Sequence, residues 1–423
     1  MKLAKYDYIF FLILMGGSIL RIISTIIVPL NPDADIYIVS ARGMLKYASY
    51  RPPMFPLFIS LFLLITGNEG LAVNLTSLTA GILLIFYSYL VFSKASMKLV
   101  ERKNMGTDHA KLIGLITSTL VALNLFLVYN NGRGLREELI TLLCILIFYF
   151  TIVKEEHNFK NMISLSCVVV ILTLTHLTFG LFMILGILFY SLLPYLKYIH
   201  VKKPSLRKLV VILLSFSSTF FIWALYNAYK VGDPFFNFHY HSLAFDFIYG
   251  INLSSLSGIL NAAVSGLLFG IPYEFYYMFI LLGFVIVLMG VYFLIKNIKK
   301  IQIFFIFIVT GINFLYLSIF MAIPGDPRLI QPFFPYILYL VGIGLANIIN
   351  HYKTIHSEKS DLGVYNFLVI CFFITYFLRG IENINLSLNP IIALLSLIFL
   401  IINEIVAFIV IYKSKNANIF FLN

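Results

Sequence analysis

Residues 8–53 open with the apolar run YIFFLILMGGSILRIISTIIVPL (8–30) and continue with the polar stretch NPDADIYIVSARGMLKYASYRPP (31–53). The core of a bilayer is about 30 Å thick and requires about 20 apolar residues of helix, which the first run supplies. The run is longer than the core of a signal peptide, and no small-residue cleavage site follows it. It therefore predicts an uncleaved membrane-spanning helix that leads into the polar stretch at the membrane surface.

The composition of the whole chain is that of a membrane protein. The chain has 423 residues, of which 61% are hydrophobic and 11% are charged. Soluble domains carry about 25% charged residues. This difference excludes a soluble enzyme, a disordered protein and a disulfide scaffold. The three cysteines all lie inside apolar runs, and their spacing suits neither a metal site nor a disulfide framework.

Apolar segments of spanning length recur along the chain. The run 54–66 is too short to span comfortably and has Pro53 and Pro56 at its start, so it predicts a re-entrant or interfacial helix. We therefore expect an all-α fold with about 12 transmembrane helices, a single transmembrane domain over residues 1–423 and no soluble C-terminal domain. The predicted spans are 8–30, 70–93, 112–130, 135–153, two short spans within 162–196, 209–229, 275–295, 301–322, 330–350, 362–379 and 389–411.

The basic residues predict the orientation. With the N-terminus inside and 54–66 not crossing, 21 of the 30 Lys and Arg residues fall in inner loops, as the positive-inside rule requires. The net charge of +12 is then a consequence of topology and does not indicate nucleic-acid binding. We expect the protein to lie in the plasma membrane with both termini in the cytoplasm.

The type of basic residue differs between the two sides. Six of the eight basic residues in the predicted outer loops are Arg, against two of the 21 inside. Arg grips a phosphate or a carboxylate with two parallel hydrogen bonds, so the outer face is predicted to bind an anion. The alternative is that these arginines pair with outer acids such as Glu137, Glu138 or Asp326.

The first outer loop and the short run after it, residues 31–66, carry the candidate acids. Asp33 and Asp35 come directly after the first span, at the start of an amphipathic pattern typical of a helix that lies along the membrane surface. An aspartate there can act as a general base toward a hydroxyl. It can equally cap the N-terminus of the surface helix, and the residues alone leave both roles open.

Two later outer loops also carry polar groups. The long loop 230–274 contains His239 and His241, which could contribute to a metal site or bind a substrate, although no third metal ligand is indicated. The segment 323–335 contains Asp326 and Arg328 among four prolines, which favours a rigid binding site. Within the membrane, Arg21 is expected to reach the outer interface with its long side chain.

In this order, the outer segments resemble the polytopic glycosyltransferases of the GT-C class, and most of all the family 39-like group of protein O-mannosyltransferases and aminoarabinose (lipid A) transferases. The motifs are Asp33 with Tyr37, the helix 41–45 (ARGML), Arg51-Pro52-Pro53, the acid at Glu137 or Glu138, and the Tyr-Asn…Gly-Asp-Pro pattern of 226–234. An Arg before a Pro-rich segment, Arg328 with Pro332 and Pro335, completes the set. Family members often carry a second acid directly after the first, whereas this chain has Ala34 there and Asp35 one position later.

The resemblance implies inverting transfer of a sugar from a polyprenyl-phosphate donor to a lipid, glycan or protein acceptor at the outer face, among membrane lipids. It assigns Asp33 as the base, with Asp35 next, and Arg51, Arg328 and, less clearly, Arg42 as ligands of the donor phosphate. Tyr37, Glu137, Glu138, His239, His241 and Asp326 are the expected substrate-binding residues. No cofactor is required, and a divalent metal is left open, as are the sugar and the acceptor.

Two other classes fit parts of the sequence. A secondary transporter also has many spans with both ends inside, but it gathers its charges near the midplane and shows repeated halves with broken helices. The sequence shows neither a repeat nor a broken-helix pair. A membrane glycan polymerase or ligase also carries outer arginines, but its large outer loop is expected late in the chain.

The re-entrant assignment of 54–66 predicts where a label can reach the next residues. A cysteine introduced at position 67 or 68, in a variant without Cys144, Cys167 and Cys371, is expected to react with an impermeant thiol reagent added outside intact cells. Reaction from the cytoplasmic side alone would show instead that 54–66 crosses the membrane.

Overall fold

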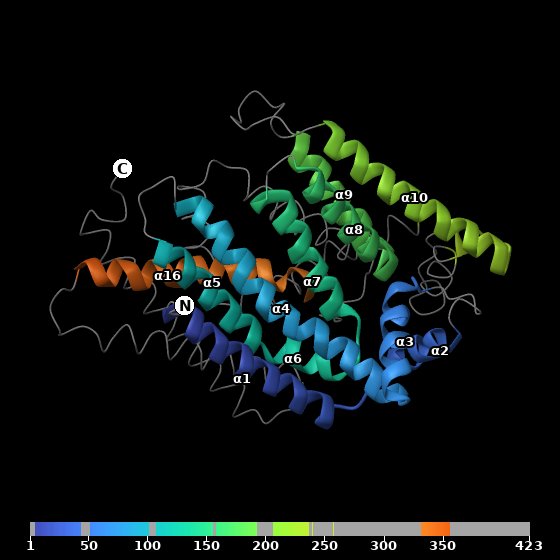
Figure 1. Cartoon of the computed structure of the whole chain (residues 1–423), viewed down its shortest axis with the longest axis horizontal. Coiled ribbons are helices and arrows are strands. Elements are labelled where there is room, and N and C mark those ends of the chain that lie inside the picture. The colour runs from blue at the N-terminus through green and yellow to red at the C-terminus, as the bar shows by residue number, and fades with distance from the viewer. Residues whose placement is uncertain are drawn as a thin grey trace.

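The computed structural model describes residues 5–43, 51–100, 107–154, 158–192, 206–236, 239, 257 and 331–355. Within these ranges every regular element is a helix, which confirms the all-α prediction for this part of the chain (Figure 1). Four of the predicted spans, 275–295, 301–322, 362–379 and 389–411, lie outside the described residues, so the number of 12 stays a prediction.

The helices follow the predicted spans closely. Three are long and apolar enough to cross a bilayer, Tyr6–Ile27, Glu69–Met97 and Leu209–Val231, as expected of an integral membrane protein. The elements are α1 (Lys5–Ile27), α2 (Pro32–Gly43), α3 (Met54–Thr66), α4 (Glu69–Val100), α5 (Thr107–Leu123), α6 (Leu125–Gly132), α7 (Glu137–Phe148), the π-helical turn η1 (Tyr149–Val153), α8 (Phe159–Thr175), α9 (Leu177–Leu192), α10 (Leu206–Val231), the 3-10 turn η6 (Gln331–Phe333) and α16 (Phe334–Ile355).

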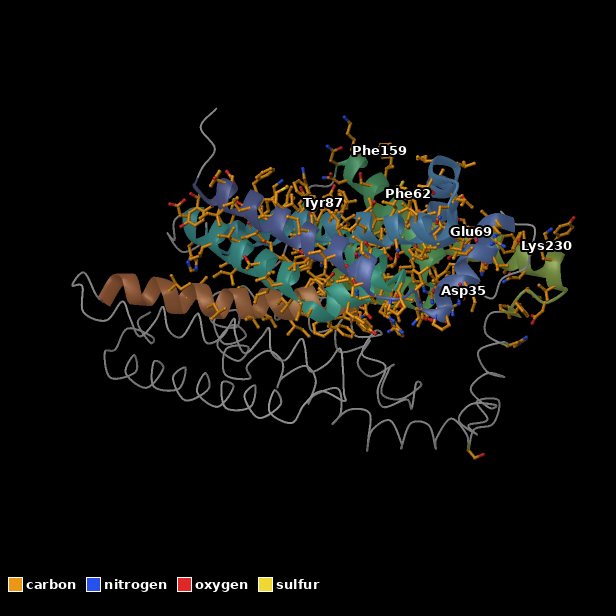
Figure 2. The ribbon with its side chains drawn as sticks, turned by 90° about the horizontal axis from the view of Figure 1, so that it is seen from below. Asp35, Phe62, Glu69, Tyr87, Phe159 and Lys230 are labelled. Atoms are coloured by element: carbon orange, nitrogen blue, oxygen red, sulfur yellow. The ribbon has the colours of Figure 1, made fainter. Side chains whose placement is uncertain are left out.

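The two short helices α2 and α3 lie together at one end of the bundle, which we call the α2 end (Figure 1). The last turn of α1, the first turn of α4 and the last turn of α10 reach the same end. Figure 2 shows Asp35 of α2, Glu69 of α4 and Lys230 of α10 gathered there. The polar helix that follows the first span therefore packs against α3 and the first part of α4, at the end of the bundle where α1 and α10 also end.

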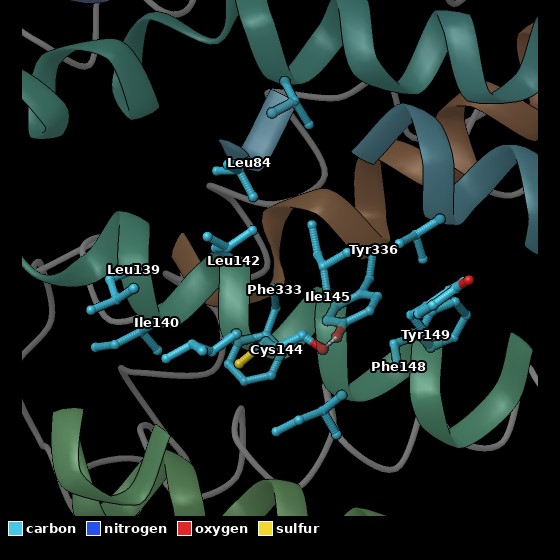
Figure 3. Packing of buried hydrophobic residues seen from close by; sticks show 14 of the residues in the cluster. Leu84, Leu139, Ile140, Leu142, Cys144, Ile145, Phe148, Tyr149, Phe333 and Tyr336 are labelled. Carbon is cyan, nitrogen blue, oxygen red and sulfur yellow. Dashed lines mark hydrogen bonds between the residues drawn. The ribbon is translucent and has the colours of Figure 1, made fainter. Parts of the chain in front are cut away.

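The centre of the bundle is formed where α4, α7 and α16 meet. The ring of Phe92 on α4 stacks on Tyr339 at 4.5 Å and packs against Phe148 of α7 at 6.0 Å, between ring centroids. The hydroxyl of Tyr336 donates to the carbonyl oxygen of Cys144 at 2.6 Å (Figure 3). Because buried tyrosine hydroxyls need a partner, this bond fixes α16 against α7 as well as filling the core. Residues 331–355 thus pack on helices near the start of the chain.

The short run 54–66 forms the helix α3 with the predicted bounds. Pro53 precedes the helix, and Gly67 ends it in the left-handed conformation (φ 64°), with its N–H bonded to Leu63. At 1.5 Å per residue, α3 is only about 20 Å long. Leu64 and Ile65 are 82% and 81% exposed, so α3 turns an apolar face outward without the length to span.

One predicted span is broken. The segment 112–130 was expected to be a continuous helix, and the expectation that the chain has no broken-helix pair is wrong, because α5 and α6 meet at Asn124 with a bend of 49°. The Asn124 side chain accepts a hydrogen bond from the backbone N–H of Leu127 at 3.0 Å and so caps the start of α6. Hydropathy did not predict the break because apolar residues flank it on both sides.

Arg21 of α1 hydrogen-bonds the backbone carbonyls on the α5 side of this break. Its guanidinium donates to the carbonyl oxygens of Ala122 at 3.2 Å and Val121 at 3.3 Å, in the last turn of α5. Carbonyls at a helix end lack intrahelical partners and carry partial negative charge, so a buried cation suits them. Arg21 is 0% exposed, and the expectation that it reaches the interface is therefore wrong.

The residues around Arg21 leave space for its side chain and offset part of its charge. A Cβ atom at Gly81 of α4 would lie 2.8 Å from Nε of Arg21, so only glycine leaves room for the guanidinium. Glu138, in the first turn of α7, is 1% exposed and lies within electrostatic reach of Arg21. A carboxylate nearby offsets part of the cost of burying the guanidinium.

We expect Arg21→Met to lower the free energy of unfolding by about 3 kcal/mol or more, because it removes two hydrogen bonds and leaves Glu138 buried without its cation. Thermal unfolding of the purified protein in detergent measures the loss. Ile22→Met, at an exposed position in the same turn of α1, is the matched control. An unchanged unfolding temperature in Arg21→Met would contradict the capping role.

Candidate functional site

The helix α2 begins where the first span ends, and Asn31 fixes its start. The Asn31 side chain accepts a hydrogen bond from the backbone N–H of Asp33 at 2.8 Å, while its own N–H donates to the carbonyl of Arg133 at 3.0 Å. Pro32 occupies the first helical position, which suits its fixed φ. The first bond caps α2 and the second ties it to the loop before α7. The acids of α2 are thereby held at a defined place.

Asp33, Arg51 and Tyr37 form a hydrogen-bonded cluster that crosses the first loop. Arg51 donates from Nη2 to Asp33 at 2.7 Å and from Nη1 to the Tyr37 hydroxyl at 2.5 Å. The side chain of Arg51 is 11% exposed and that of Asp33 is 32% exposed. The carboxylate therefore remains partly exposed to solvent, while the guanidinium is shielded.

Tyr37 is the buried centre of this cluster. It is 1% exposed, and its ring packs edge-on against Phe55 of α3 at 5.0 Å. The guanidinium of Arg51 lies 4.7 Å from the ring centre, and that of Arg136 lies 5.7 Å from it. Burial raises the pKa of the Tyr37 hydroxyl, and the two arginines oppose that rise. The Tyr37 hydroxyl therefore remains protonated, and two guanidinium groups lie near its ring.

The two acids of α2 differ in environment. Asp33 is half-buried and ion-paired with Arg51, whereas Asp35 is exposed. Two residues apart on a helix, their side chains point in nearly opposite directions. Within the described part of the chain, the Asp35 side chain makes no ion pair or hydrogen bond. The fold thus joins Asp33, and not Asp35, to the arginine cluster.

Arg42 lies outside the cluster. It pairs with Glu69 at the start of α4 through two hydrogen bonds, and its side chain is 58% exposed. Arg42 and Arg51, both predicted to bind the donor phosphate, therefore lie in different environments. Arg42 bridges two helices at the surface, whereas Arg51 is held beside Asp33.

The two adjacent glutamates at the start of α7 also separate. Glu137 is half-buried and lies within electrostatic reach of Tyr37. Glu138 is buried beside Arg21, and among the described residues neither of its carboxylate oxygens has a hydrogen-bond partner. Successive residues of a helix point about 100° apart, which is why two neighbouring acids serve different places.

The remaining candidates lie apart or outside the described residues. His239 bonds through Nδ1 to Asp233 at 2.7 Å, close to the end of α10, and is exposed. Arg328, Asp326 and His241 lie outside the described residues. Within the described ranges, no three His, Cys, Asp or Glu side chains are grouped as a metal would require.

The structure adds Arg136, which the sequence analysis counted among the outer arginines without giving it a role. It stands at the N-terminal cap of α7, and Nη1 donates to the carbonyl of Thr175 at 3.0 Å, where α8 ends. The signal in the sequence was its place beside Glu137, at the outer start of the predicted span 135–153. The site is thus built from three separate segments: the first loop, the start of α7 and the junction of α8 with α9.

Comparison with solved structures supports the resemblance in fold. The chain is similar to the crystal structure of ArnT from Cupriavidus metallidurans bound to undecaprenyl phosphate, with 13% identity, a TM-score of 0.52, and coverage of 96% of this chain and 76% of that one. The apo state of the same protein matches with 14% identity, the same TM-score, and coverage of 94% and 75%. ArnT is an aminoarabinose lipid A transferase with a GT-C fold. No protein-family model and no curated protein sequence matches the chain.

The different environments of the two arginines predict different effects on stability. Arg51→Gln is expected to lower the free energy of unfolding by about 1–3 kcal/mol, because a shielded carboxylate and hydroxyl lose their donor. Arg42→Gln removes only an exposed pair and is expected to leave the unfolding temperature almost unchanged. Thermal unfolding of both variants under the same conditions makes the comparison. An unchanged unfolding temperature in Arg51→Gln would mean that the Asp33 cluster contributes nothing to stability, and an equal loss in the two variants would contradict the difference between their environments.

Proposed function

We propose that the protein is a membrane glycosyltransferase that moves a sugar from a polyprenyl-phosphate donor to an acceptor hydroxyl at the α2 end of the bundle. The observation that carries the proposal is the contact of Asp33 with Arg51 on the first polar loop. It brings an acid and a shielded cation together where the first span leaves the membrane. The similarity of the fold to ArnT, across almost the whole chain, supports the same class of reaction.

In the proposed reaction Asp33 accepts the proton of the acceptor hydroxyl. The hydroxyl oxygen attacks the anomeric carbon from the face opposite the phosphate, so the new C–O bond forms as the bond to the phosphate oxygen breaks. The bonding electrons leave with that oxygen, and the products are an inverted glycoside, polyprenyl phosphate and a protonated Asp33. A partly exposed carboxylate beside a shielded cation suits this role. We rank Asp35 second because it is exposed and lies outside the cluster.

Arg51 is the proposed first ligand of the donor phosphate. It is shielded and already oriented by Tyr37, so its guanidinium needs little reordering when an anion arrives. Arg328 is proposed as a further ligand on the resemblance alone. Arg42 is a weaker candidate, because Glu69 holds it at the surface. Tyr37, being buried, would position Arg51 and not touch the sugar.

The lipid part of the donor fits the apolar body of the protein, and the acceptor reaches Asp33 from the water side. On the charge distribution, we propose that the α2 end faces outward from the plasma membrane and that both termini are cytoplasmic. Glu137 lies within electrostatic reach of Tyr37 and is the proposed substrate contact of α7. The sugar and the acceptor class are left to experiment.

The test is transfer of labelled sugar from polyprenyl-phosphate donors to membrane acceptors by the purified protein. Asp33→Asn is expected to reduce kcat at least about 100-fold, as loss of a general base does, and Asp35→Asn to reduce it far less. Asp108→Asn, an exposed acid in the first turn of α5, is the control for removing a carboxylate.

Unchanged transfer in both Asp33→Asn and Asp35→Asn would overturn the mechanism. Uptake of free sugar into sealed vesicles without a covalent product would identify a secondary transporter instead. Extension of a lipid-linked glycan in place of single transfer would identify a polymerase.

A further inference from the structure

Arg136 is held at the site by neutral groups. Its Nη1 donates to the carbonyl of Thr175 at 3.0 Å, and its guanidinium lies beside the ring of Tyr37. Within the described residues, no carboxylate oxygen lies within 4.0 Å of it. Arg51 and Arg42, in contrast, are ion-paired with Asp33 and Glu69. Arg136 is therefore the arginine of this cluster whose charge is not matched by direct contact with an acid of the described part.

One donor of Arg136 is also left open. Its Nε is inaccessible to solvent and has no hydrogen-bond partner among the described residues. A buried N–H of a charged group without a partner is costly, so such an atom commonly marks the place of a ligand. A guanidinium whose N–H groups are not all occupied can still donate a hydrogen bond to a phosphate oxygen.

Arg136 and Arg51 converge on the same residue. Their guanidinium carbons lie 5.7 Å and 4.7 Å from the centre of the Tyr37 ring, and Arg51 donates to the Tyr37 hydroxyl. Holding two like charges close together costs free energy. Asp33 offsets the charge of Arg51 by direct contact, and an anion beside Arg136 would offset the other. Arg136 comes from α7 and Arg51 from the first loop, so the arrangement results from tertiary folding and not from a local run of bases.

The proposed reaction requires a second positive charge at one particular stage. The donor is a phosphodiester with one negative charge. When the bond to the sugar breaks, the phosphate becomes a monoester and gains a second negative charge. Interactions that are stronger in the transition state than with the bound donor raise kcat. A cation without a direct acidic partner is suited to that second charge.

We propose that Arg136 is a second phosphate-binding residue of this site, which holds the negative charge that develops on the departing polyprenyl phosphate while Arg51 holds the intact donor. This inference rests on the proposed function. It assigns a role to the start of α7 that is separate from that of Glu137.

The test compares two probes that differ by one charge: a polyprenyl phosphate monoester and its methyl diester. At pH 8 the monoester carries close to two negative charges and the diester one. Wild-type protein in detergent is expected to bind the monoester more tightly. In Arg136→Gln the preference for the monoester is expected to fall by about 10–100-fold, the effect of losing a charge-assisted hydrogen bond, while affinity for the diester stays near that of the wild type.

Two further variants separate binding from folding. Arg136→Lys keeps the charge and is expected to retain part of the preference. Arg133→Gln removes an arginine from the same loop, one that rests on the ring of Tyr129 and not on Tyr37, and is expected to keep the wild-type preference. In the transfer assay, Arg136→Gln should lower kcat and leave KM for the donor almost unchanged.

The outcomes are distinct. Equal weakening of both probes in Arg136→Gln, or an unchanged preference, would overturn the second-cation role while leaving the proposed function intact. Wild-type protein that binds neither probe would overturn the proposed function itself. If Arg136→Gln does not elute and unfold like the wild type, Arg136→Lys is compared with Arg133→Gln instead. A preference for the monoester in Arg136→Lys that equals the preference of Arg133→Gln and of the wild type would contradict the need for a guanidinium at this position.

Discussion

The architecture depends on one requirement of the bilayer, that no backbone polar group within it is left without a partner. The bend between α5 and α6 creates such groups in the middle of a predicted span. Arg21 supplies donors to the carbonyls at the end of α5, and Asn124 caps the start of α6. The buried guanidinium needs Gly81 for space and Glu138 for charge. A single arginine thus links α1, α4, α5 and α7, the helices on which the first loop rests.

The candidate site is assembled by the same logic of shielded polar groups. Asn31 ties α2 to the loop before α7, and Arg136 ties that loop to the end of α8. Arg51 then joins the first loop to Asp33 and Tyr37. The Asn31–Arg133 and Arg136–Thr175 contacts join segments that are distant in sequence, whereas Arg51 bonds within the first loop, so the complete arrangement depends on both local and tertiary contacts. The degree of shielding, more than the type of residue, separates the arginines that are proposed to bind the phosphate from Arg42, which is exposed at the surface.

Patterns of hydropathy and charge were sufficient to predict much of this structure. The short helix 54–66 has the predicted bounds, because a proline before it and a glycine after it are local signals. The division of 162–196 into two short spans was also predicted, since polar residues interrupt the apolar run, and the break falls at His176. The break at Asn124, the burial of Arg21 and the divergence of Glu137 from Glu138 were not, because each depends on which helix lies opposite. Arg136 was visible as an outer arginine, but its role depends on Tyr37 and Thr175, which are distant in sequence.

The bond between Arg136 and Thr175 has a further consequence for a protein that works in a lipid phase. The helix before this junction, α8, has 17 residues. At 1.5 Å per residue it is about 26 Å long, less than the roughly 30 Å of an average hydrocarbon core. Hydrophobic mismatch is relieved by local thinning of the bilayer or by movement of the helices. A change in bilayer thickness is therefore expected to move the end of α8 that carries the Thr175 carbonyl, and with it the guanidinium of Arg136.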